Sequence, residues 1–330
     1  MTNRFPRSIT GVLAGAITGA LLLGAAPLHA TEGGSGSYLL GSRDTMSGIV
    51  PPPGTYLSAD LVYYTGHIDQ LSISGIVLAN ANTEIFLTKI NLTHSFDGHI
   101  LGGRPALTIT VPIVDGTLTF DSVLFGASRR ISDHRTGFSD PIITPGLGWD
   151  NGHSHIAAQL SIFVPVGYYD LATVDVVTRS IDALSFGKNR FAFVPTLSYT
   201  SFSPKSGFEF SISSGITLSL RNQATDYQTA PEWQVESAVM QHLKSGFAFG
   251  ATGYGYYQLG EDSGTGADNL RRQLGAQSLQ ARVFGAGPLI TYATKLNGHS
   301  LSFKLKYVEE FGAKRRFESQ IFWGNIAYAF

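Results

Sequence analysis

The residues with the clearest chemical potential in this 330-residue chain are two histidines separated by one residue, His153-Ser154-His155. Residues two positions apart on a strand point to the same face, so the two imidazoles could share a divalent ion. A catalytic zinc site usually has a third protein ligand, and the sequence specifies none. We therefore predict no metal and no other cofactor. We interpret His153 and His155 as polar residues that line the lumen, the hollow interior of the fold predicted below, or its rim.

A hydrolytic triad of Asp140, Ser154 and His155 is the second chemistry that these residue types suggest. The neighbourhood of Ser154 lacks the glycine-flanked turn of a nucleophile elbow. Cysteine is absent from the chain, which excludes thiol nucleophiles, disulfide scaffolds and thiolate metal sites. The sequence therefore predicts that the protein is not an enzyme.

The composition narrows the class of protein further. Charged residues make up 14% of the chain, where about 25% is usual, so the chain differs from a typical soluble domain. Hydrophobic residues make up 43%, which is enough to bury a large surface and excludes general disorder. The formal net charge is -1, so no basic field exists that would attract nucleic acid.

The first 30 residues read as a secretory signal peptide. Arg4 and Arg7 form a short basic region, residues 9–26 are almost all apolar or small, and Ala30 places a small residue at the cleavage edge. The alternative is an uncleaved membrane anchor, because the apolar run approaches the ~20 residues that cross a bilayer. We divide the remainder into a Gly/Pro-rich N-terminal segment of residues 31–53, which lies in the periplasm or plugs a lumen, and an outer-membrane β-barrel of residues 54–330.

Beyond the leader the dominant pattern is alternation of apolar and polar residues, which is typical of β-strands. From Phe208 to Leu220 one parity is mostly aromatic or aliphatic, and the other parity is small or polar. Twelve steps at ~3.3 Å give about 40 Å of strand, and a tilt of about 45° reduces this to about 28 Å of height. That height matches the ~25 Å apolar band of a membrane barrel, whereas soluble strands have about five or six residues. The pattern predicts an all-β fold, a transmembrane antiparallel up-and-down β-barrel.

Segments of this kind number about eleven, and we predict about twelve strands, with ten to fourteen as the range, because bacterial barrels of one chain use even numbers. The missing strand is expected within residues 70–78 or 117–124. Tight turns are expected at residues 203–207 and 296–298. Residues 125–150 are expected to form a long loop that acts as a lid or a contact surface. A lumen of this width should hold a narrow conduit or a ligand-sized cavity.

The C-terminal strand carries the most specific signal in the chain. Phe322, Ile326, Tyr328 and Phe330 share one parity, and the chain stops at an aromatic residue. Barrels of the Gram-negative outer membrane end in this way, and their assembly machinery recognises the terminal strand, plausibly by pairing along its exposed edge. We therefore interpret these four residues as the assembly signal.

Polar residues in or beside the predicted strands are assigned to the lumen or its rim. These lumen or rim candidates are Asp60, Asp140, His153, His155, Gln159, Glu209, Arg221, Lys304 and Glu309. Charges that we expect to hold water, loops or a plug in place are Asp60, Glu209, Glu232, Glu236, Lys304, Lys306, Glu309 and Glu310.

Aromatic residues near strand ends are expected to form girdles at the two membrane interfaces. The girdle candidates are Tyr56, Tyr63, Tyr64, Trp149, Trp233, Tyr254, Tyr256, Tyr257, Trp323 and Tyr328. A second use stays open, because aromatic rings also line paths for aromatic solutes by stacking.

Three prolines, Pro112, Pro165 and Pro195, each follow a valine in or beside a candidate strand. Proline cannot donate to the hydrogen-bond ladder of a sheet, so each marks a strand end, a bulge or an unpaired edge. Two interpretations stay open. The prolines are ordinary strand ends at a rim, or they mark a lateral gate, a weakened seam through which an apolar solute leaves sideways into the lipid.

Short motifs follow one another in a characteristic order along the mature chain. They are G-S-R-D-T-M-S-G-I-V-P-P-P-G-T-Y (residues 41–56), Asp140-Pro141, Leu147-Gly148-Trp149, His153 with His155, Val164-Pro165-Val166-Gly167, Val194-Pro195 and Gly285-Ala286-Gly287-Pro288. In this order, over about residues 38–330, the chain resembles the outer-membrane family named for the meta-cleavage pathway of phenol degradation. The resemblance implies a Gram-negative outer-membrane β-barrel associated with passage of hydrophobic or aromatic compounds, and it carries over no catalytic residues. The Gln228-Thr229 turn departs from the family pattern, so the resemblance fixes no particular substrate.

The leading functional prediction is an outer-membrane channel or transporter for passive passage of small hydrophobic or aromatic compounds. The expected partners are outer-membrane lipid and lipopolysaccharide, the barrel-assembly machinery and small apolar or aromatic solutes, with no nucleic acid. Two alternatives are kept: a structural or adhesive barrel that acts through its loops, and a lipid-modifying barrel enzyme.

Overall fold

Twelve antiparallel strands close into one barrel, which confirms the predicted fold and strand number. The computed structural model describes residues 34–73, 76–122, 129–175 and 180–330, so the predicted signal peptide lies outside the described residues. The strands are β1 (Gly54–Ile73), β2 (Ile76–Ser95), β3 (Arg104–Ser122), β4 (Arg129–Phe138), β5 (Ile142–Asp150), β6 (Ser154–Phe163), β7 (Thr173–Asp175), β8 (Ser180–Asp182), β9 (Ala192–Phe202), β10 (Phe208–Ser219), β11 (Glu232–His242), β12 (Phe247–Gln258), β13 (Arg282–Leu296), β14 (His299–Lys314) and β15 (Glu318–Ala329). The β7–β8 hairpin stands outside the barrel sheet.

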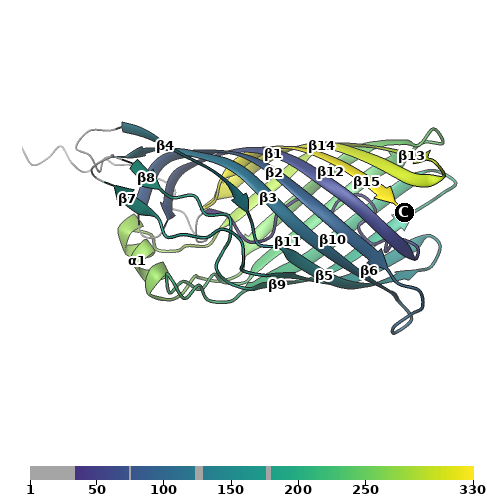
Figure 1. The fold of residues 1–330 in the computed structure, drawn as a ribbon, viewed down its shortest axis with the longest axis horizontal. Helices are drawn as coiled ribbons and strands as arrows, with labels where there is room; N and C mark the ends of the chain where they lie inside the picture. Colours follow the sequence, from purple (N-terminus) through teal and green to yellow (C-terminus); the bar gives the residue numbers. More distant parts are fainter. Residues whose placement is uncertain (1–33, 74–75, 123–128, 176–179) are drawn as a thin grey trace, which may run out of the picture.

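The ladder between the first and the last strand closes the barrel. β1 pairs with β15 from Tyr56 opposite Ala329 to His67 opposite Glu318. Figure 1 shows the strands tilted around a common axis, with β15 returning beside β1. Closure matters because backbone N–H and C=O groups in hydrocarbon have no water to bind and must pair within the protein.

One barrel strand is built from two pieces, β4 and β5, which both pair with the same edge of β3. The strand that the sequence left unplaced therefore lies mainly in residues 129–150, and the prediction of a long loop over residues 125–150 was wrong. Residues 70–73, 76–78 and 117–122 instead extend β1, β2 and β3. The sequence of β4 and β5 is polar and contains prolines, and its alternation is interrupted between Phe138 and Ile142. For this reason the alternation pattern did not identify the strand.

Two prolines explain that interruption. Ile113 faces Phe138 and Thr110 faces Ile142, so two residues of β3 face three residues of the broken strand, as in a β-bulge. Pro112 and Pro141 stand on the two sides of this break, and neither has an N–H to donate. The two prolines therefore remove two ladder donors at the break.

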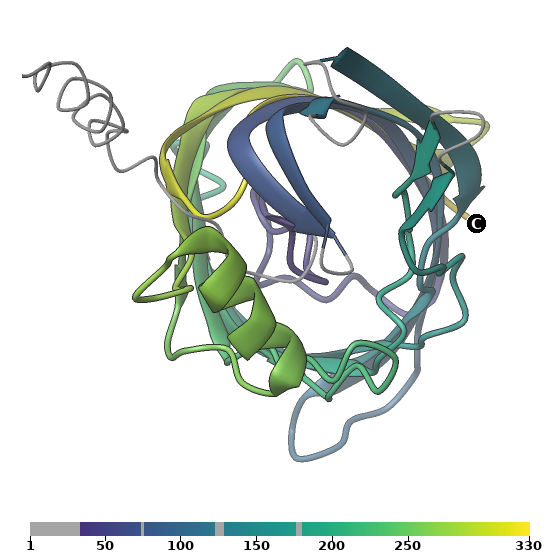
Figure 2. The same cartoon turned by 90° about the vertical axis from the view of Figure 1, so that its left-hand side faces the viewer.

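The two ends of the barrel differ in their connections. One end has the chain end at Ala329 and the short turns of residues 151–153, 203–207, 243–246 and 297–298, and the predicted turns at 203–207 and 296–298 are confirmed. The other end has the long connections, including helix α1 (Thr265–Leu274), which lies across one side of the mouth in Figure 2. In membrane barrels the short turns face the periplasm and the longer loops face the exterior. In the described part of the chain, no helix is both long and apolar enough to cross a membrane.

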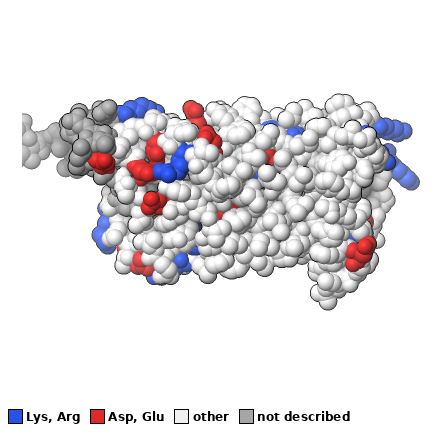
Figure 3. All heavy atoms as spheres, in the orientation of Figure 1, with Lys and Arg blue, Asp and Glu red and all other residues white. Residues whose placement is uncertain are grey.

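The outer and inner faces follow the predicted alternation. On β10, Phe208, Ile216 and Leu218 face outward, whereas Glu209 and Ser211 are fully buried toward the lumen. Figure 3 shows a middle band almost free of charged atoms, with Lys, Arg, Asp and Glu gathered toward the barrel ends. This band is the surface that contacts acyl chains.

The inner face of the barrel carries aromatic side chains as well as the small and polar residues that the sequence predicts there. The girdle assignment is therefore wrong for part of its residues. Tyr254, Tyr256 and Trp323 are buried in the lumen, and Tyr64 packs against them, so these four are not girdle residues. Tyr63, Trp233 and Tyr257 face outward, as a girdle requires. Strand parity separates the two groups, because neighbouring residues of a strand point to opposite faces.

We expect an arginine in the middle of the apolar band to destabilise the barrel far more than one at its edge. Leu305 lies in the middle of β14 and is 67% exposed on the outer face, whereas Leu296 lies at the β13–β14 turn. An arginine at the bilayer midplane costs about 2–4 kcal/mol, and one near the interface costs about 0–1 kcal/mol.

The measurement is reversible denaturant unfolding of Leu305→Arg and Leu296→Arg barrels refolded in phospholipid vesicles. Equal losses of unfolding free energy in the two variants would show that Leu305 does not contact the hydrocarbon.

Candidate functional site, a cavity beside the lumen plug

Residues 34–53 run through the inside of the barrel and form a plug. Figure 2 shows this segment, in purple, enclosed by the ring of strands. At the mouth, the Ser35 carbonyl oxygen accepts a hydrogen bond from Lys188 Nζ at 3.0 Å. Near the periplasmic end, Ser95 Oγ donates to the Pro51 carbonyl oxygen at 2.8 Å. The plug therefore extends along most of the lumen.

Two buried carboxylates of the wall hold the backbone of the plug. Glu236 accepts from the Gly41 N–H and the Arg43 N–H, each at 2.6 Å. Glu209 accepts from the Met46 N–H at 2.6 Å. The plug has no ladder to satisfy its N–H groups, and charged acceptors form strong hydrogen bonds with such donors. These two predicted lumen charges thus fix the path of an irregular segment.

An ion cluster fastens the middle of the plug. The Asp44 carboxylate lies 2.9 Å from Lys304 Nζ and 2.8 Å from Lys306 Nζ, and Lys306 also donates to the Gly41 carbonyl oxygen. All of these groups are shielded from solvent, so removing one partner would leave a buried charge without compensation.

Close backbone contacts fasten the periplasmic end. A Cβ atom at Gly48 would lie 2.5 Å from the Thr200 nitrogen, and one at Gly148 would lie 2.5 Å from Val50 Cβ. The plug and the wall therefore meet with no room for a side chain at these two positions.

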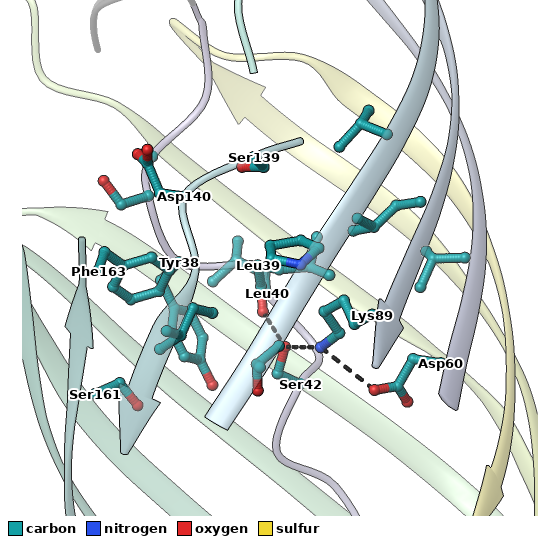
Figure 4. Close-up of a pocket in the computed structure, with 18 of the residues that line it drawn as sticks. Tyr38, Leu39, Leu40, Ser42, Asp60, Lys89, Ser139, Asp140, Ser161 and Phe163 are labelled. Carbon is teal, nitrogen blue, oxygen red and sulfur yellow. Dashed lines mark hydrogen bonds and ion pairs between the residues drawn. The ribbon is translucent and has the colours of Figure 1, made fainter. Parts of the chain in front are cut away.

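A cavity of about 500 Å³ lies between the plug and the wall, and most of its wall residues come from β1, β2, β3, β5 and β6. Figure 4 shows Lys89 and Asp60 on one side and Phe163 and Asp140 on the other, with Leu39 and Leu40 of the plug between them. Along β1 the lining passes from Ser58 and Asp60 near the periplasm to Val62 and Tyr64, and on β14 Glu310 adds a charged group toward the mouth.

Several of the predicted lumen or rim candidates meet at this cavity. Asp60, Asp140, Gln159 and Lys304 line it. Asp60 accepts from Trp323 Nε1 at 2.9 Å, from Asn325 Nδ2 at 2.8 Å and from Asn91 Nδ2 at 2.9 Å. The sequence identified these residues as inward-facing, and the register of the barrel brings them together.

The remaining candidates lie elsewhere. His155 is buried on β6, with Nδ1 3.3 Å from Asp150 Oδ1, whereas His153 lies exposed in the periplasmic turn. Arg221 pairs with an aspartate of an external loop, and Glu309 is exposed on the outer side of β14. The two histidines therefore do not form a paired site, and no cluster of three or more metal-ligating side chains occurs among the described residues.

The hydrolytic triad is not assembled. Ser154 and His155 begin β6, whereas Asp140 lies beside the opposite end of that strand, where Ile142 faces Phe163. Nine residue steps separate Ser154 from Phe163, or about 30 Å of strand, which no hydrogen-bond relay of three side chains spans.

The wall has a distinct seam beside β4. β4 pairs with β3 on one edge, and no described strand pairs with its other edge. The described residues of the connection from β6 to β9, 164–175 and 180–191, cover that edge. The Tyr168 N–H donates to the Phe138 carbonyl oxygen at 2.8 Å. Asp133 Oδ2 accepts from the Ala183 and Leu184 N–H groups, each at 2.8 Å.

Asp140 clamps both ends of this connection at the strand break. Its carboxylate accepts from the Gly167 N–H at 3.0 Å and from the Lys188 N–H at 2.8 Å. Phe186 fills the space that Gly116 leaves open, since a Cβ atom at Gly116 would lie 3.1 Å from its ring. The seam is therefore closed by side chains and a few hydrogen bonds in place of a full ladder.

The three predicted strand-break prolines lie in different parts of the wall. Pro112 lies at the break, where its carbonyl oxygen accepts from the Ser139 N–H at 3.1 Å. Pro165 follows Val164, whose N–H donates to the Pro141 carbonyl oxygen at 3.0 Å. Pro195 faces outward inside β9, opposite Leu160 of β6. On the β10 side the pairing skips Val194 and Pro195 and continues on both sides of them.

Sequence reasoning missed Arg43, Asp44 and Lys89 as cavity and plug residues. Lys89 sits in an alternating strand, so its inward parity was a usable signal. Arg43 and Asp44 lie in a segment without periodicity, and nothing local indicates which wall residues they meet.

The external mouth contains a buried carboxylic acid. Asp262, between β12 and α1, accepts from the Ala230 N–H at 2.8 Å and from the Tyr227 hydroxyl. Burial raises the pKa of Asp262 to about 6. Because the folded-state pKa lies above the ordinary value, packing of this loop is favoured in mildly acidic solution and weakens as the pH rises through about 6.

Comparison with known proteins agrees with this geometry. The model of the family described as MetA-pathway of phenol degradation matches residues 69–326. No curated protein sequence matches the chain. The COG4313 outer membrane channel of Pseudomonas putida F1 is similar in structure, with a TM-score of 0.62, 13% identity, and coverage of 85% of this chain and 97% of that chain.

Two further barrels show weaker similarity. The translocator domain of the autotransporter NalP of Neisseria meningitidis has a TM-score of 0.46 at 11% identity, with 85% of this chain and 90% of that chain covered. A FadL homologue of Pseudomonas aeruginosa has a TM-score of 0.41 at 8% identity, with 83% of this chain and 88% of that chain covered.

We expect Asp44→Asn to release the plug. The change leaves Lys304 and Lys306 facing each other without an anion, and breaking a buried ion pair from one side costs about 3–5 kcal/mol. Conductance of single channels in planar bilayers should rise severalfold, because the lumen behind the plug becomes continuous.

The matched control is Asp268→Asn, which removes an exposed ion pair with Arg271 on α1. It should leave the conductance unchanged. An Asp44→Asn channel with wild-type conductance would contradict the role of this cluster in holding the plug.

Proposed function

Since the chain belongs to the MetA-pathway of phenol degradation family, we propose that it is a passive outer-membrane channel for small hydrophobic and aromatic compounds. The observation that carries the proposal is a cavity of about 500 Å³ inside a membrane barrel, whose lining includes the apolar side chains of Leu39, Leu40, Val62, Leu87 and Phe163. An apolar cavity of about 150 Å³ is enough to hold benzene, so about 500 Å³ accommodates a substituted ring. A purely polar pore would offer such a solute no favourable surface.

The plug suggests how the route is kept selective. Its carboxylate and lysine anchors hold it against the wall opposite the cavity, so water-filled passage along the lumen is narrow. An apolar solute gains free energy by leaving water for the cavity, whereas an ion or sugar does not. Passage needs no energy source, because the solute moves down its own gradient.

The seam beside β4 supplies the exit in this proposal. Val114, Phe163 and Phe186 line the cavity close to the break, where Pro112, Pro165 and Asp140 interrupt the ladder. Displacing the connection of residues 164–191 breaks a few hydrogen bonds and leaves the twelve-strand ladder of the lower wall intact. An apolar solute could then pass sideways into lipid. Exit along the barrel axis is less favourable for such a solute, because it would pass the polar rim.

The partners follow from the same surfaces. The apolar band contacts outer-membrane lipid, and the charged external end meets lipopolysaccharide. Phe322, Ile326 and Phe330 lie on the outer face of β15, and with Tyr328 they form the strand that the barrel-assembly machinery would read. Small apolar or aromatic molecules are the transported solutes.

A disulfide across the seam tests the proposal directly. A Cβ atom at Gly137 would lie 3.5 Å from Tyr168 Cβ, which fits a disulfide, and the chain has no cysteine of its own. In oxidised Gly137→Cys/Tyr168→Cys proteoliposomes, uptake of toluene and phenol should fall at least fivefold, and reduction should restore it, whereas small-ion conductance should stay constant.

The matched control is Gly253→Cys/Ala286→Cys, which joins β12 to β13, where the corresponding Cβ distance is 3.7 Å. Its uptake should not change on oxidation. Equal effects of the two disulfides would reject the seam, and wild-type vesicles that take up toluene and phenol no faster than empty ones would reject the channel.

A further inference from the structure

The periplasmic part of the cavity is built to bind a polar group. Hydroxyl and amide side chains of four neighbouring wall strands converge there, among them Asn91, Thr110, Thr144 and Ser161. Thr110 Oγ1 donates to Asn91 Oδ1 at 2.7 Å, and Thr144 Oγ1 donates to Ser161 Oγ at 3.0 Å. A wholly apolar solute would leave these groups without any new partner.

The carboxylates that line the cavity already have partners. Asp60 accepts three side-chain hydrogen bonds and lies 3.6 Å from Lys89 Nζ. Asp140 accepts two backbone N–H groups, and Glu310 Oε1 accepts from the Tyr254 hydroxyl at 2.8 Å and lies 3.9 Å from Arg316. Asp60 and Asp140 therefore have little capacity left for a cationic solute, whereas Glu310 keeps one buried oxygen, Oε2, without a hydrogen-bond partner among the described residues.

The cations are less completely matched. Lys89 Nζ has Asp60 at 3.6 Å and Ser42 Oγ at 3.5 Å, both long contacts, and its third neighbour is the Trp323 ring at 4.7 Å. Arg43 also lines the cavity, and no carboxylate of the described residues forms an ion pair with its side chain. The lining as a whole holds more cations than carboxylates: the carboxylates are Asp60, Asp140 and Glu310, and the cations are Arg43, Lys89, Lys188, Lys304 and Arg316.

We infer that the cavity binds amphiphiles with a carboxylate head, which Arg43 and Lys89 hold while the apolar body lies toward Val62, Leu87 and Phe163. This inference rests on the proposed channel function and narrows its substrate class. Carboxylic acids have pKa values of about 4 and phenols of about 10, so at neutral pH only the acids bring a negative charge to these two cations. Arginine adds a planar pair of donors that matches a carboxylate.

The test compares four probes: 4-phenylbutyrate, 4-phenylbutanol and 4-phenylbutylamine, which share one apolar body, and octanoate, which separates aromatic from aliphatic acids. Binding is read from Trp323 fluorescence in a Trp149→Phe/Trp233→Phe background, because Trp323 is buried and touches Lys89. Phenylbutyrate should bind about tenfold more tightly than the alcohol, as expected for one charge-assisted hydrogen-bond pair. The amine should bind most weakly, and octanoate shows whether the ring is needed.

Substitutions at the two cations sharpen the result. Arg43→Gln and Lys89→Gln should each lower phenylbutyrate affinity about tenfold and leave phenylbutanol affinity unchanged, whereas Lys89→Arg should retain the acid preference. Lys244→Gln, which removes an exposed cation in a periplasmic turn, is the matched control and should change nothing. Because Arg43 lies in the plug, Arg43→Gln leaves every barrel strand unaltered.

The outcomes separate the two proposals. Equal affinities for acid and alcohol, or tighter binding of the amine, would overturn the carboxylate inference while the channel proposal stands. Absence of binding by all four probes, together with no uptake of phenol or toluene, would overturn the channel proposal itself.

Discussion

Backbone hydrogen bonding in a medium without water is the constraint on which this structure depends. The β1–β15 ladder satisfies it by removing the two open edges that a flat sheet would expose to lipid. The outer residues can then be apolar, which explains why only 14% of the chain is charged. It also explains why the charges that do occur gather at the ends and inside the lumen, as Figure 3 shows for the outer face.

Closure creates a second requirement, since twelve strands enclose more space than their own side chains fill. The N-terminal segment occupies that space, and its irregular backbone needs acceptors that a ladder would otherwise provide. Glu209 and Glu236 accept its N–H groups, and Lys304 and Lys306 neutralise Asp44. The cavity is the part of the lumen that this segment leaves unfilled.

The same constraint is relaxed beside β4 in the described wall. Pro112 and Pro141 cannot donate, so the ladder breaks between β4 and β5, and a connection held by Asp140 covers the gap. The ladder between β9 and β10 also skips Val194 and Pro195, but β9 stays paired with β6 there and with β10 on both sides of the gap. What distinguishes the seam is that β4 has no described strand on its second edge.

Alternation with a period of two predicted eleven of the twelve strands and most of their facing from the sequence alone, because it is a local property that a single strand such as residues 208–220 displays in full. It also marked Glu209, Asp60 and Lys304 as inward-facing. It did not reveal the strand within residues 129–150, whose alternation is broken, or the inward turn of Tyr254 and Tyr256. Only the tertiary structure brought Asp44 to Lys304, 260 residues away, and Arg43 to the cavity that Lys89 lines. These contacts depend on barrel closure, strand register and the path of a segment without periodicity. None of the three can be inferred from the local order of residues.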